Sequence, residues 1–404
     1  MREQKKLLLL GGSAPQIIAI QTAKRLGYNT VLCDFLPDNP GQHYADKFYL
    51  LSTTDKEAVL RVAQEEKIDG IVAYSSDPAA PTAAYVSEKM GLYGVPYKTA
   101  ESFCEKHLFR EFLKNNGFNV PWSIEITEST DDKTLECVQL PAIIKPTDSS
   151  GSKGVTVIRS AHEFVAARNY ALQYARNHIA IAEEFIERDH PDVIEAEIFV
   201  IDGAVAVWGL MSSVRDQHTN PLLPAAYCYP IRLAPERIDL VKREVSRLVQ
   251  CANVKYGAFN IEMVITKENR LFFLDAGPRN GGNMLPEYIG GIMHRDLVEA
   301  TIYSAMGEYG HIEDLKLDGT EGGYWGLVVL HTNCHGILKG IEYSKVAKQC
   351  LLREHLLAES GSMVHPFSMS RDAVGLAFFR FPSQEIRDEI LDDFTGQHIK
   401  VVVE

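Results

Sequence analysis

Two short apolar segments in the second half of the chain carry acidic side chains whose spacing suits a metal ion. The segments AFNIEMVI (258–265) and LFFLDAG (271–277) flank a polar stretch, and this pattern predicts a β-hairpin. If the turn is centred on residues 268–269, Glu262 lies directly opposite Asp275. Cross-strand neighbours have Cβ atoms about 5 Å apart, so two carboxylates there repel each other.

Such a pair calls for a cation or a shared proton. Mg²⁺ is commonly held by two carboxylates together with phosphate oxygens, which makes a metal site one interpretation of Glu262 and Asp275. The alternative is a register that differs by one residue and turns the two acids apart. Under the metal interpretation, Asp275→Asn should leave the empty hairpin equally or more stable.

The residues that follow the hairpin form the glycine-rich segment GPRNGGN (277–283). Glycines allow a close approach of the backbone, and the planar guanidinium of Arg279 suits a carboxylate or a phosphate. Taken alone, this segment also fits an ordinary loop with a surface arginine.

A second candidate hairpin, PAIIKPTDSSGSKGV (141–155), delivers Lys145 into a loop of small polar residues. Loops of this kind can expose backbone N–H groups to an anion. The alternative is a flexible surface hairpin. No G-K-[ST] sequence leads into a helix, so the loop is not a Walker motif.

Two further segments carry weaker signals. IAEEFIERDH (181–190) presents adjacent acids that could border a nucleobase, although two exposed acids on a strand are common. Arg215 and His218 lie in a polar segment, 211–229, from which an acceptor pocket could be built, yet a lone Arg and a lone His are more often surface groups.

The N-terminal turn at 11–13 follows a strand, but it lacks G-x-G-x-x-G, and we interpret it as a tight turn rather than a dinucleotide site.

Composition limits the class of protein. The 404 residues exceed one ordinary core and predict two to three domains. A net charge of −13 argues against a general nucleic-acid binder, so positive charge must be concentrated locally if phosphates are bound. Seven cysteines without a C-x-x-C pair indicate reduced thiols, and no apolar run reaches the roughly 18 residues of a membrane span, so we expect a cytoplasmic protein.

The order of elements predicts how these residues are positioned. Residues 1–98 alternate strand and helix signals, which predicts an open parallel sheet with helices on both faces. A charged helix over 100–116 then precedes a strand-rich region that extends to about residue 203. Two long strands (258–265 and 270–275) and a helical stretch around 294–306 follow. Residues 311–404 are expected to form a separate β-rich domain.

In this order, the segments resemble the ATP-grasp superfamily over essentially the whole chain. The opening KKLLLLGG…KIDGIVAY is similar to the pre-ATP-grasp domain of biotin carboxylase and carbamoyl-phosphate synthetase, and EKHLFREFLKNNGFNVP resembles the segment that follows it. The resemblance implies a mixed α/β and α+β fold: a Rossmann-like pre-ATP-grasp domain (1–98), an ATP-grasp domain (99–310) with a β-rich lid at about 120–185, and a small β-rich C-terminal domain (311–404).

The resemblance also implies a role for each matching residue. Lys106 and Lys145 would contact the phosphates of ATP, and Arg279 would stabilise the transferred phosphoryl group or orient the acceptor. Glu262 and Asp275 would hold Mg²⁺, with Mn²⁺ as an alternative. The lid over the phosphates would comprise Ser149, Ser150, Gly151, Ser152 and Gly154. The adenine hinge would comprise Glu183 or Glu184 with Phe185 and Ile186, and the candidates for the ribose-binding acid are Asp192, Glu195 and Glu197.

One departure from the family pattern concerns the metal site. The family usually has E-x-N-P-R, whereas this chain has D-A-G-P-R, so Gly277 removes the customary Asn oxygen. The ATP-dependent aminoimidazole ribonucleotide carboxylases resemble it in lacking that Asn. We therefore expect a higher Mg²⁺ requirement, which Gly277→Asn would lower if the backbone accepts a side chain.

The function implied by the resemblance is an ADP-forming carboxylate–amine ligase that makes an acyl phosphate and couples it to an amine. The alternatives are a bicarbonate-activating carboxylase or carbamoyl-phosphate-synthase-like enzyme, a nucleotide-binding protein without catalysis, and an NAD oxidoreductase that uses the N-terminal turn. The expected partners are small carboxylates and amines, without nucleic acid or membrane, and a homodimer is left open.

Overall fold

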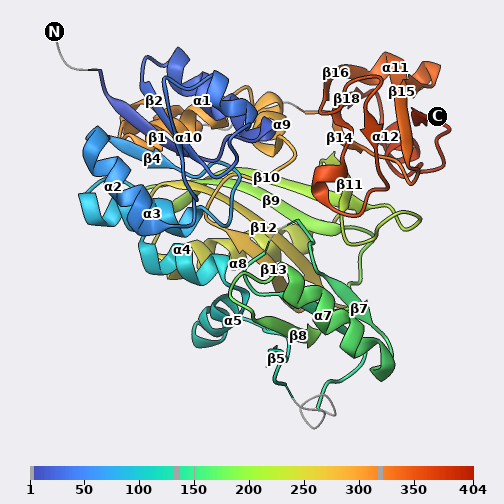
Figure 1. Ribbon diagram of the computed structural model, residues 1–404. Helices are drawn as coiled ribbons and strands as arrows, with labels where there is room; N and C mark the ends of the chain where they lie inside the picture. Colours follow the sequence, from blue (N-terminus) through green and yellow to red (C-terminus); the bar gives the residue numbers. More distant parts are fainter. Residues whose placement is uncertain (1–3, 131–136, 150, 317–321) are drawn as a thin grey trace.

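The computed structural model describes residues 4–130, 137–149, 151–316 and 322–404. Figure 1 shows an N-terminal layer, a lid and a C-terminal region arranged around one large central sheet. None of the helices in these ranges is long and apolar enough to cross a membrane.

The N-terminal layer is a parallel sheet with strand order β3-β2-β1-β4. It alternates with helices as the sequence predicts: β1, β2 and β4 are mostly apolar and buried on both faces, whereas β3 is a partly exposed edge strand. One face packs against α2 and α3, and the other packs against α1 and the later helix α10. The bounds are β1 (Lys6–Leu10), β2 (Asn29–Asp34), β3 (Lys47–Leu50), β4 (Gly70–Val72), α1 (Ile17–Arg25), α2 (Lys56–Glu66), α3 (Ala80–Met90) and α10 (Leu297–Ala305).

The predicted helix over 100–116 is two helices, α4 (Tyr97–Cys104) and α5 (Lys106–Asn115). Glu105 between them has an extended backbone, with φ −110° and ψ 111°. The break frees the Lys106 N–H, which donates to the Thr147 carbonyl at 2.9 Å. Lys106 thus starts α5 at the edge of the lid, in a position that one continuous helix would not give it.

The lid is a four-stranded sheet with order β5-β8-β6-β7, and α7 packs against one of its faces. Small and β-branched residues such as Ala142, Ile144, Ala180 and Ala182 fill the narrow core between helix and sheet. The bounds are β5 (Ser123–Ile126), β6 (Ala142–Pro146), β7 (Thr156–Ile158), β8 (Ala180–Glu184) and α7 (Phe164–Tyr174).

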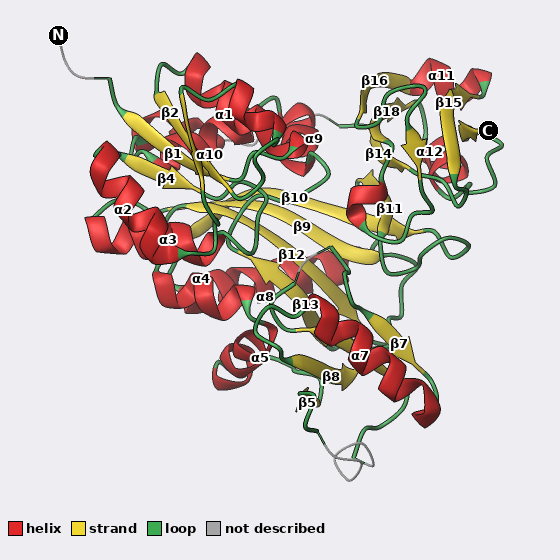
Figure 2. Ribbon diagram, in the orientation of Figure 1, coloured by secondary structure: helices red, strands yellow, loops and turns green. Residues whose placement is uncertain are grey.

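The central sheet has eight antiparallel strands in the order β13-β12-β9-β10-β11-β14-β18-β16. α8 covers one face, while α9 and α10 contribute to the core on the other, as Figure 2 helps to follow. The bounds are β9 (Val193–Ile201), β10 (Ala204–Arg215), β11 (Pro224–Tyr229), β12 (Gly257–Ile265), β13 (Leu271–Gly277), β14 (Tyr324–Leu330), β16 (Leu351–Leu356), β18 (Gly375–Phe381), α8 (Pro235–Ala252) and α9 (Leu285–Met293).

The expected boundary at residue 311 does not interrupt this sheet. β14 pairs with β11 across four residue pairs, and β18 and β16 extend the sheet further. The C-terminal region adds a three-stranded sheet of its own, ordered β17-β15-β19. Its remaining elements are β15 (Gly336–Tyr343), β17 (Met363–Val364), β19 (Ile399–Val403), α11 (Lys345–Cys350) and α12 (Gln384–Leu391).

Candidate active site

A cavity of about 480 Å³ lies between lid strands β6 and β8 and the hairpin of β12 and β13. The sequence-predicted residues that line it are Lys106, Lys145, Ser149, Gly151, Ser152, Glu183, Glu184, Phe185, Ile186, Arg215, Glu262 and Asp275. Among the described candidates, the lining does not include Gly154, Asp192, Glu195, Glu197, His218 and Arg279. Ser150 lies outside the described residues.

The predicted pairing of Glu262 with Asp275 is present, although by a different route. Next to the turn, Ile265 pairs with Leu271. The turn is therefore centred on residue 268, and not between residues 268 and 269 as expected. A bulge at Leu274 then shifts the register by one and brings the two acids opposite each other. Arg110 Nη2 donates to the Leu274 carbonyl at 2.8 Å and so binds the irregular strand at this point.

The acids form a row across three strands, because Glu262 also lies opposite Glu195 of β9. Glu195 is 2% exposed, and burial together with the Glu262 charge raises its pKa well above the usual range. Asn260 Nδ2 donates to Glu195 at 2.7 Å. The buried Glu195 therefore lies behind Glu262 rather than in the cavity, and this position does not favour a contact with ribose.

Each of the two candidate metal ligands is paired with a basic side chain. Lys106 Nζ lies 3.1 Å from Asp275 Oδ2, and Arg215 Nη2 lies 2.9 Å from Glu262 Oε1. Burial raises the pKa of Asp275, but Lys106 and more distant cations more than offset this, so the net pKa is lowered. The repulsion expected from the sequence is therefore compensated within the protein.

The donor set fits Mg²⁺ in the manner of nucleotide enzymes. Within the described residues, no group of three or more His, Cys, Asp or Glu side chains is placed to hold a metal by itself. Glu262 and Asp275 line the cavity as cross-strand partners and leave room for oxygens from a ligand. Mg²⁺ binds in this way, through one or two carboxylates plus phosphate and water.

Glu183 is the centre of a buried ion cluster. It is 2% exposed and accepts from Arg110 Nε at 2.6 Å, from Arg110 Nη2 at 3.2 Å and from Lys145 Nζ at 2.6 Å. Burial alone would raise its pKa, but Arg110 and Lys145 bring it down to about 2. Both oxygens are already engaged, so the adjacent Glu184, which is exposed and lines the cavity, is better placed to meet an adenine amine.

Sequence reasoning did not single out Arg110, which lines the same cavity. It lies four residues after Lys106 on α5, and residues four apart share a helix face. That spacing was the available signal.

The small-residue loop of the lid contacts three other parts of the chain. The Ser149 carbonyl accepts from Lys106 Nζ at 3.2 Å, and Ser152 Oγ donates to the Leu222 carbonyl at 3.0 Å. Gly151 has φ +67°, and a Cβ there would lie 2.9 Å from Ser370 Oγ of the C-terminal region. Ser149, Gly151 and Ser152 of this loop line the cavity, and Gly154 lies against Ala171 and Tyr174 of α7.

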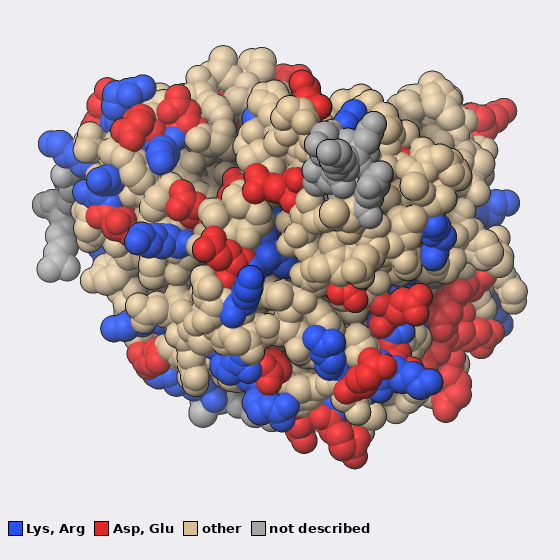
Figure 3. Space-filling model, turned by 90° about the horizontal axis from the view of Figure 1, so that it is seen from below, with Lys and Arg blue, Asp and Glu red and all other residues tan. Residues whose placement is uncertain are grey.

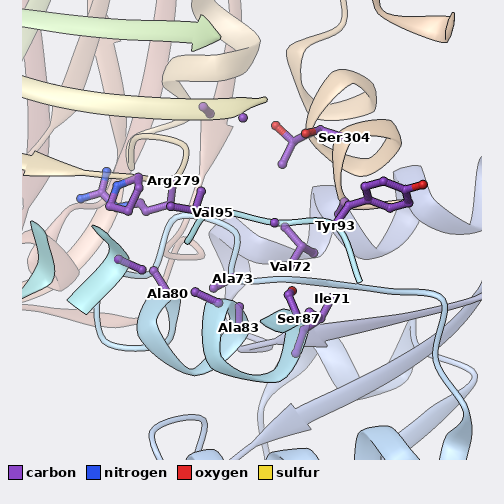
Figure 4. Close-up of a pocket in the computed structure, with 18 of the residues that line it drawn as sticks. Ile71, Val72, Ala73, Ala80, Ala83, Ser87, Tyr93, Val95, Arg279 and Ser304 are labelled. Atoms are coloured by element: carbon purple, nitrogen blue, oxygen red, sulfur yellow. The ribbon is translucent and has the colours of Figure 1, made fainter. Parts of the chain in front are cut away.

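Arg279 lies away from the main cavity. Its Nε and Nη2 donate to the two oxygens of Asp77 at 2.7 and 2.6 Å, and its Nη1 donates to the Asn280 carbonyl at 3.1 Å. Burial lowers its pKa, but Asp77 more than offsets this and raises it. Figure 4 shows Arg279 at a separate cavity of about 90 Å³, lined mainly by small apolar residues of the N-terminal layer.

Two other parts of the chain considered in the sequence analysis, the ribose-acid candidate Asp192 and the N-terminal turn at 11–13, have protein groups as partners. Asp192 is 6% exposed and lies 3.4 Å from Arg232 Nη1. At the N-terminal turn, Gly12 N donates to Asp34 at 2.7 Å, and a Cβ on Gly12 would lie 2.1 Å from Asn39 Oδ1. Protein groups thus fill the space beside this turn, in agreement with a structural role.

Figure 3 shows acidic and basic side chains interspersed over the face seen from below, without a continuous basic surface there. The cavity has a local excess of positive charge, as phosphate binding by an acidic protein requires: six basic side chains line it (Lys106, Arg110, Lys145, Arg159, Arg188 and Arg215) against four acidic ones (Glu183, Glu184, Glu262 and Asp275).

The chain contains an ATP-grasp domain. Residues 138–287 match the model of the ATP-grasp domain. The chain is 25% identical to the formate-dependent phosphoribosylglycinamide formyltransferase of Bacteroides thetaiotaomicron, over 68% of this chain and 70% of that protein. It is 26% identical to the enzyme of the same name from Escherichia coli O157:H7, over 68% and 69%.

Solved structures share the fold over the whole chain. The L-amino acid ligase from Bacillus licheniformis superposes with a TM-score of 0.77 at 20% identity, and the two chains cover each other completely. The phosphoribosylglycinamide synthetase from Anaerococcus prevotii gives a TM-score of 0.75 at 21% identity, again with complete coverage of both chains.

Proposed function

We propose that the protein is an ATP- and Mg²⁺-dependent ligase that phosphorylates a small carboxylate and passes the acyl group to an amine, releasing ADP and phosphate. The observation that carries the proposal is the cavity itself. It combines an opposed acid pair, two buried lysines and a small-residue loop, which are the parts that phosphoryl transfer from ATP requires.

Under this proposal, each residue has a role that its position supports. Lys106 and Lys145 bind the phosphates, and the backbone of loop 149–154 covers them. Phe185 and Ile186 border the base, with Glu184 accepting from its amine. Glu262 and Asp275 would hold Mg²⁺, which supplies charge neutralisation to the transferred group. Closure of the loop excludes water, so that the acyl phosphate reacts with the amine rather than being hydrolysed.

Formate is the first carboxylate to consider. The relatives found by sequence carry formate dependence in their names, and each matches about two thirds of this chain. The nucleophile would then be the glycyl amine of a phosphoribosylglycinamide, as in those names. Amino acids form the second candidate class, because an L-amino acid ligase shares the fold over the whole chain.

The test is ADP release from Mg-ATP in the presence of formate, bicarbonate or single L-amino acids, each with and without hydroxylamine. Hydroxylamine traps an acyl phosphate as a hydroxamate. We expect hydroxamate with one class of carboxylate, and none when ATP is replaced by a non-hydrolysable analogue. ADP release that is independent of every carboxylate, without hydroxamate, would refute the proposal.

A further inference from the structure

Arg215 is a buried arginine with an unused hydrogen-bonding arm. It ends β10, is 8% exposed and lines the 480 Å³ cavity. Its Nη2 is bound to Glu262, whereas its Nη1 is buried and has no hydrogen-bond acceptor within the described part of the chain. A buried donor without an acceptor is costly, so this nitrogen indicates that a ligand supplies the acceptor.

A second cation lies in the same wall. Arg188 lines the cavity and donates to the carbonyls of His190 and Pro191. Burial lowers its pKa, and the nearby charge of Arg215 lowers it further. The guanidinium groups of Arg188 and Arg215 are close enough for the charge of one to lower the pKa of the other. This corner of the cavity, defined by Arg188 and Arg215, is therefore suitable for an anion.

The corner is separate from the two lysines assigned to ATP. In the central sheet, β12 and β9 lie between β13 and β10. Lys106 contacts Asp275 on β13, whereas Arg215 reaches Glu262 from β10. The two cations therefore approach the acid pair from opposite sides, with the phosphate-binding residues on one side and an open anion position on the other.

Arg279 is not available for this position. All three of its side-chain nitrogens donate to Asp77 or to the Asn280 carbonyl, and it borders a different cavity. Arg279 is therefore not placed to orient the acceptor carboxylate, which is the role expected for it from the sequence. That role is open to another residue.

We propose that Arg215 binds the acceptor carboxylate and holds it for attack on ATP. This proposal rests on the proposed function. Nη1 donates to one carboxylate oxygen, while the other attacks the γ-phosphorus. An acyl C–O–P linkage forms as the bond from the γ-phosphorus to the β–γ bridging oxygen breaks, and ADP leaves with that electron pair, without proton transfer.

The test compares Arg215→Gln and Arg215→Lys with a matched control, Gln217→Ala, which alters an uncharged residue of the same cavity. KM is measured separately for ATP and for the carboxylate that the wild-type enzyme uses, and ATP affinity is measured by calorimetry. Losing a charge-assisted hydrogen bond predicts a 10- to 100-fold rise in the carboxylate KM for Arg215→Gln. ATP affinity should change less than about threefold, and added guanidinium ion should restore part of the activity.

Three outcomes would overturn the proposal. An unchanged carboxylate KM in a folded Arg215→Gln protein means that Arg215 does not bind the acceptor. A KM for ATP that rises as much as that for the carboxylate means that Arg215 binds phosphate instead. If Arg215→Gln fails to fold, Arg215→Lys is decisive, since a wild-type carboxylate KM with that shorter, non-forked cation excludes the guanidinium contact.

The failure of the proposed function would look different. In that case the wild-type enzyme itself would form no ADP or hydroxamate with any carboxylate, and the assignment of Arg215 would fail with it.

Discussion

Glu183→Gln tests the buried ion cluster and separates two roles for Glu183. The substitution leaves Arg110 and Lys145, which are 6% and 9% exposed at their side chains, without a counter-charge. The folded-state pKa of Glu183 is about 2, against 4.5 for a free Glu. That difference corresponds to about 3 kcal/mol of stability, within the range seen when one partner of a buried ion pair is removed.

The effect can be measured by thermal or urea unfolding. A loss of about 3 kcal/mol predicts a fall in melting temperature on the order of 6–12 °C for a domain of this size. Because the pKa is depressed on folding, the carboxylate contributes fully above pH 4.5, and its contribution is lost as the pH falls toward 2. The difference between wild type and Glu183→Gln should therefore narrow below pH 4.5.

ATP provides a second measurement on the same variant. With Glu183 neutral, the charges of Lys145 and Arg110 are no longer offset, so Mg-ATP should raise the melting temperature of Glu183→Gln by more than it raises that of wild type. Glu184→Gln is the matched control, and we expect normal apo stability with weaker ATP binding. Normal apo stability together with lost ATP binding in Glu183→Gln would refute this reasoning and restore its direct contact with adenine.

The remaining predictions concern the hairpin and the loop. Asp275→Asn removes the counter-charge of Lys106, but the Asp275 side chain is 43% exposed, so the apo melting temperature should fall by only about 2–4 °C. The same substitution should abolish the extra stabilisation by Mg²⁺ with ATP. An apo protein more stable than wild type would instead support repulsion between Glu262 and Asp275. Gly277→Asn should impair folding or activity rather than lower the Mg²⁺ requirement, because a Cβ would lie 2.4 Å from Asp77 Oδ1; a lower requirement in Mg²⁺ titrations would contradict this. Proteolysis within the loop at 149–154 should slow when Mg-ATP is added, and cleavage that is indifferent to nucleotide would count against a phosphate contact.

The sequence was sufficient to predict the sites that depend on order along the chain. The pairing of Glu262 with Asp275 and the apolar strand that carries Lys145 follow from alternation and spacing, which are local properties. Even there, the bulge at Leu274 escaped prediction, because nothing in its immediate neighbours distinguishes it from a regular strand residue.

Contacts between distant segments could not be predicted in this way. Arg279 finds Asp77 from 202 positions away, and Arg110 finds Glu183 from 73. Each pairing depends on how separate elements pack, and any of several acids could have been the partner on sequence grounds. The same limit applies to Arg215: the sequence indicates it as a possible part of an acceptor pocket, but its burial, and an Nη1 without an acceptor among the described residues, depend on how β10 packs beside its neighbours.

The continuity of the central sheet determines which parts of the chain can be removed. A shortened protein that ends at residue 310 would lose β14, β18 and β16, and the backbone of β11 would become an open edge. An exposed edge of this kind recruits strands from other molecules and promotes aggregation. The truncation would also remove Ser370, which lies beside Gly151 of the loop. The C-terminal region is therefore a poor point for fusion, exchange or deletion, whereas the lid, which has its own four-stranded sheet and core, is the unit that could be transplanted between relatives.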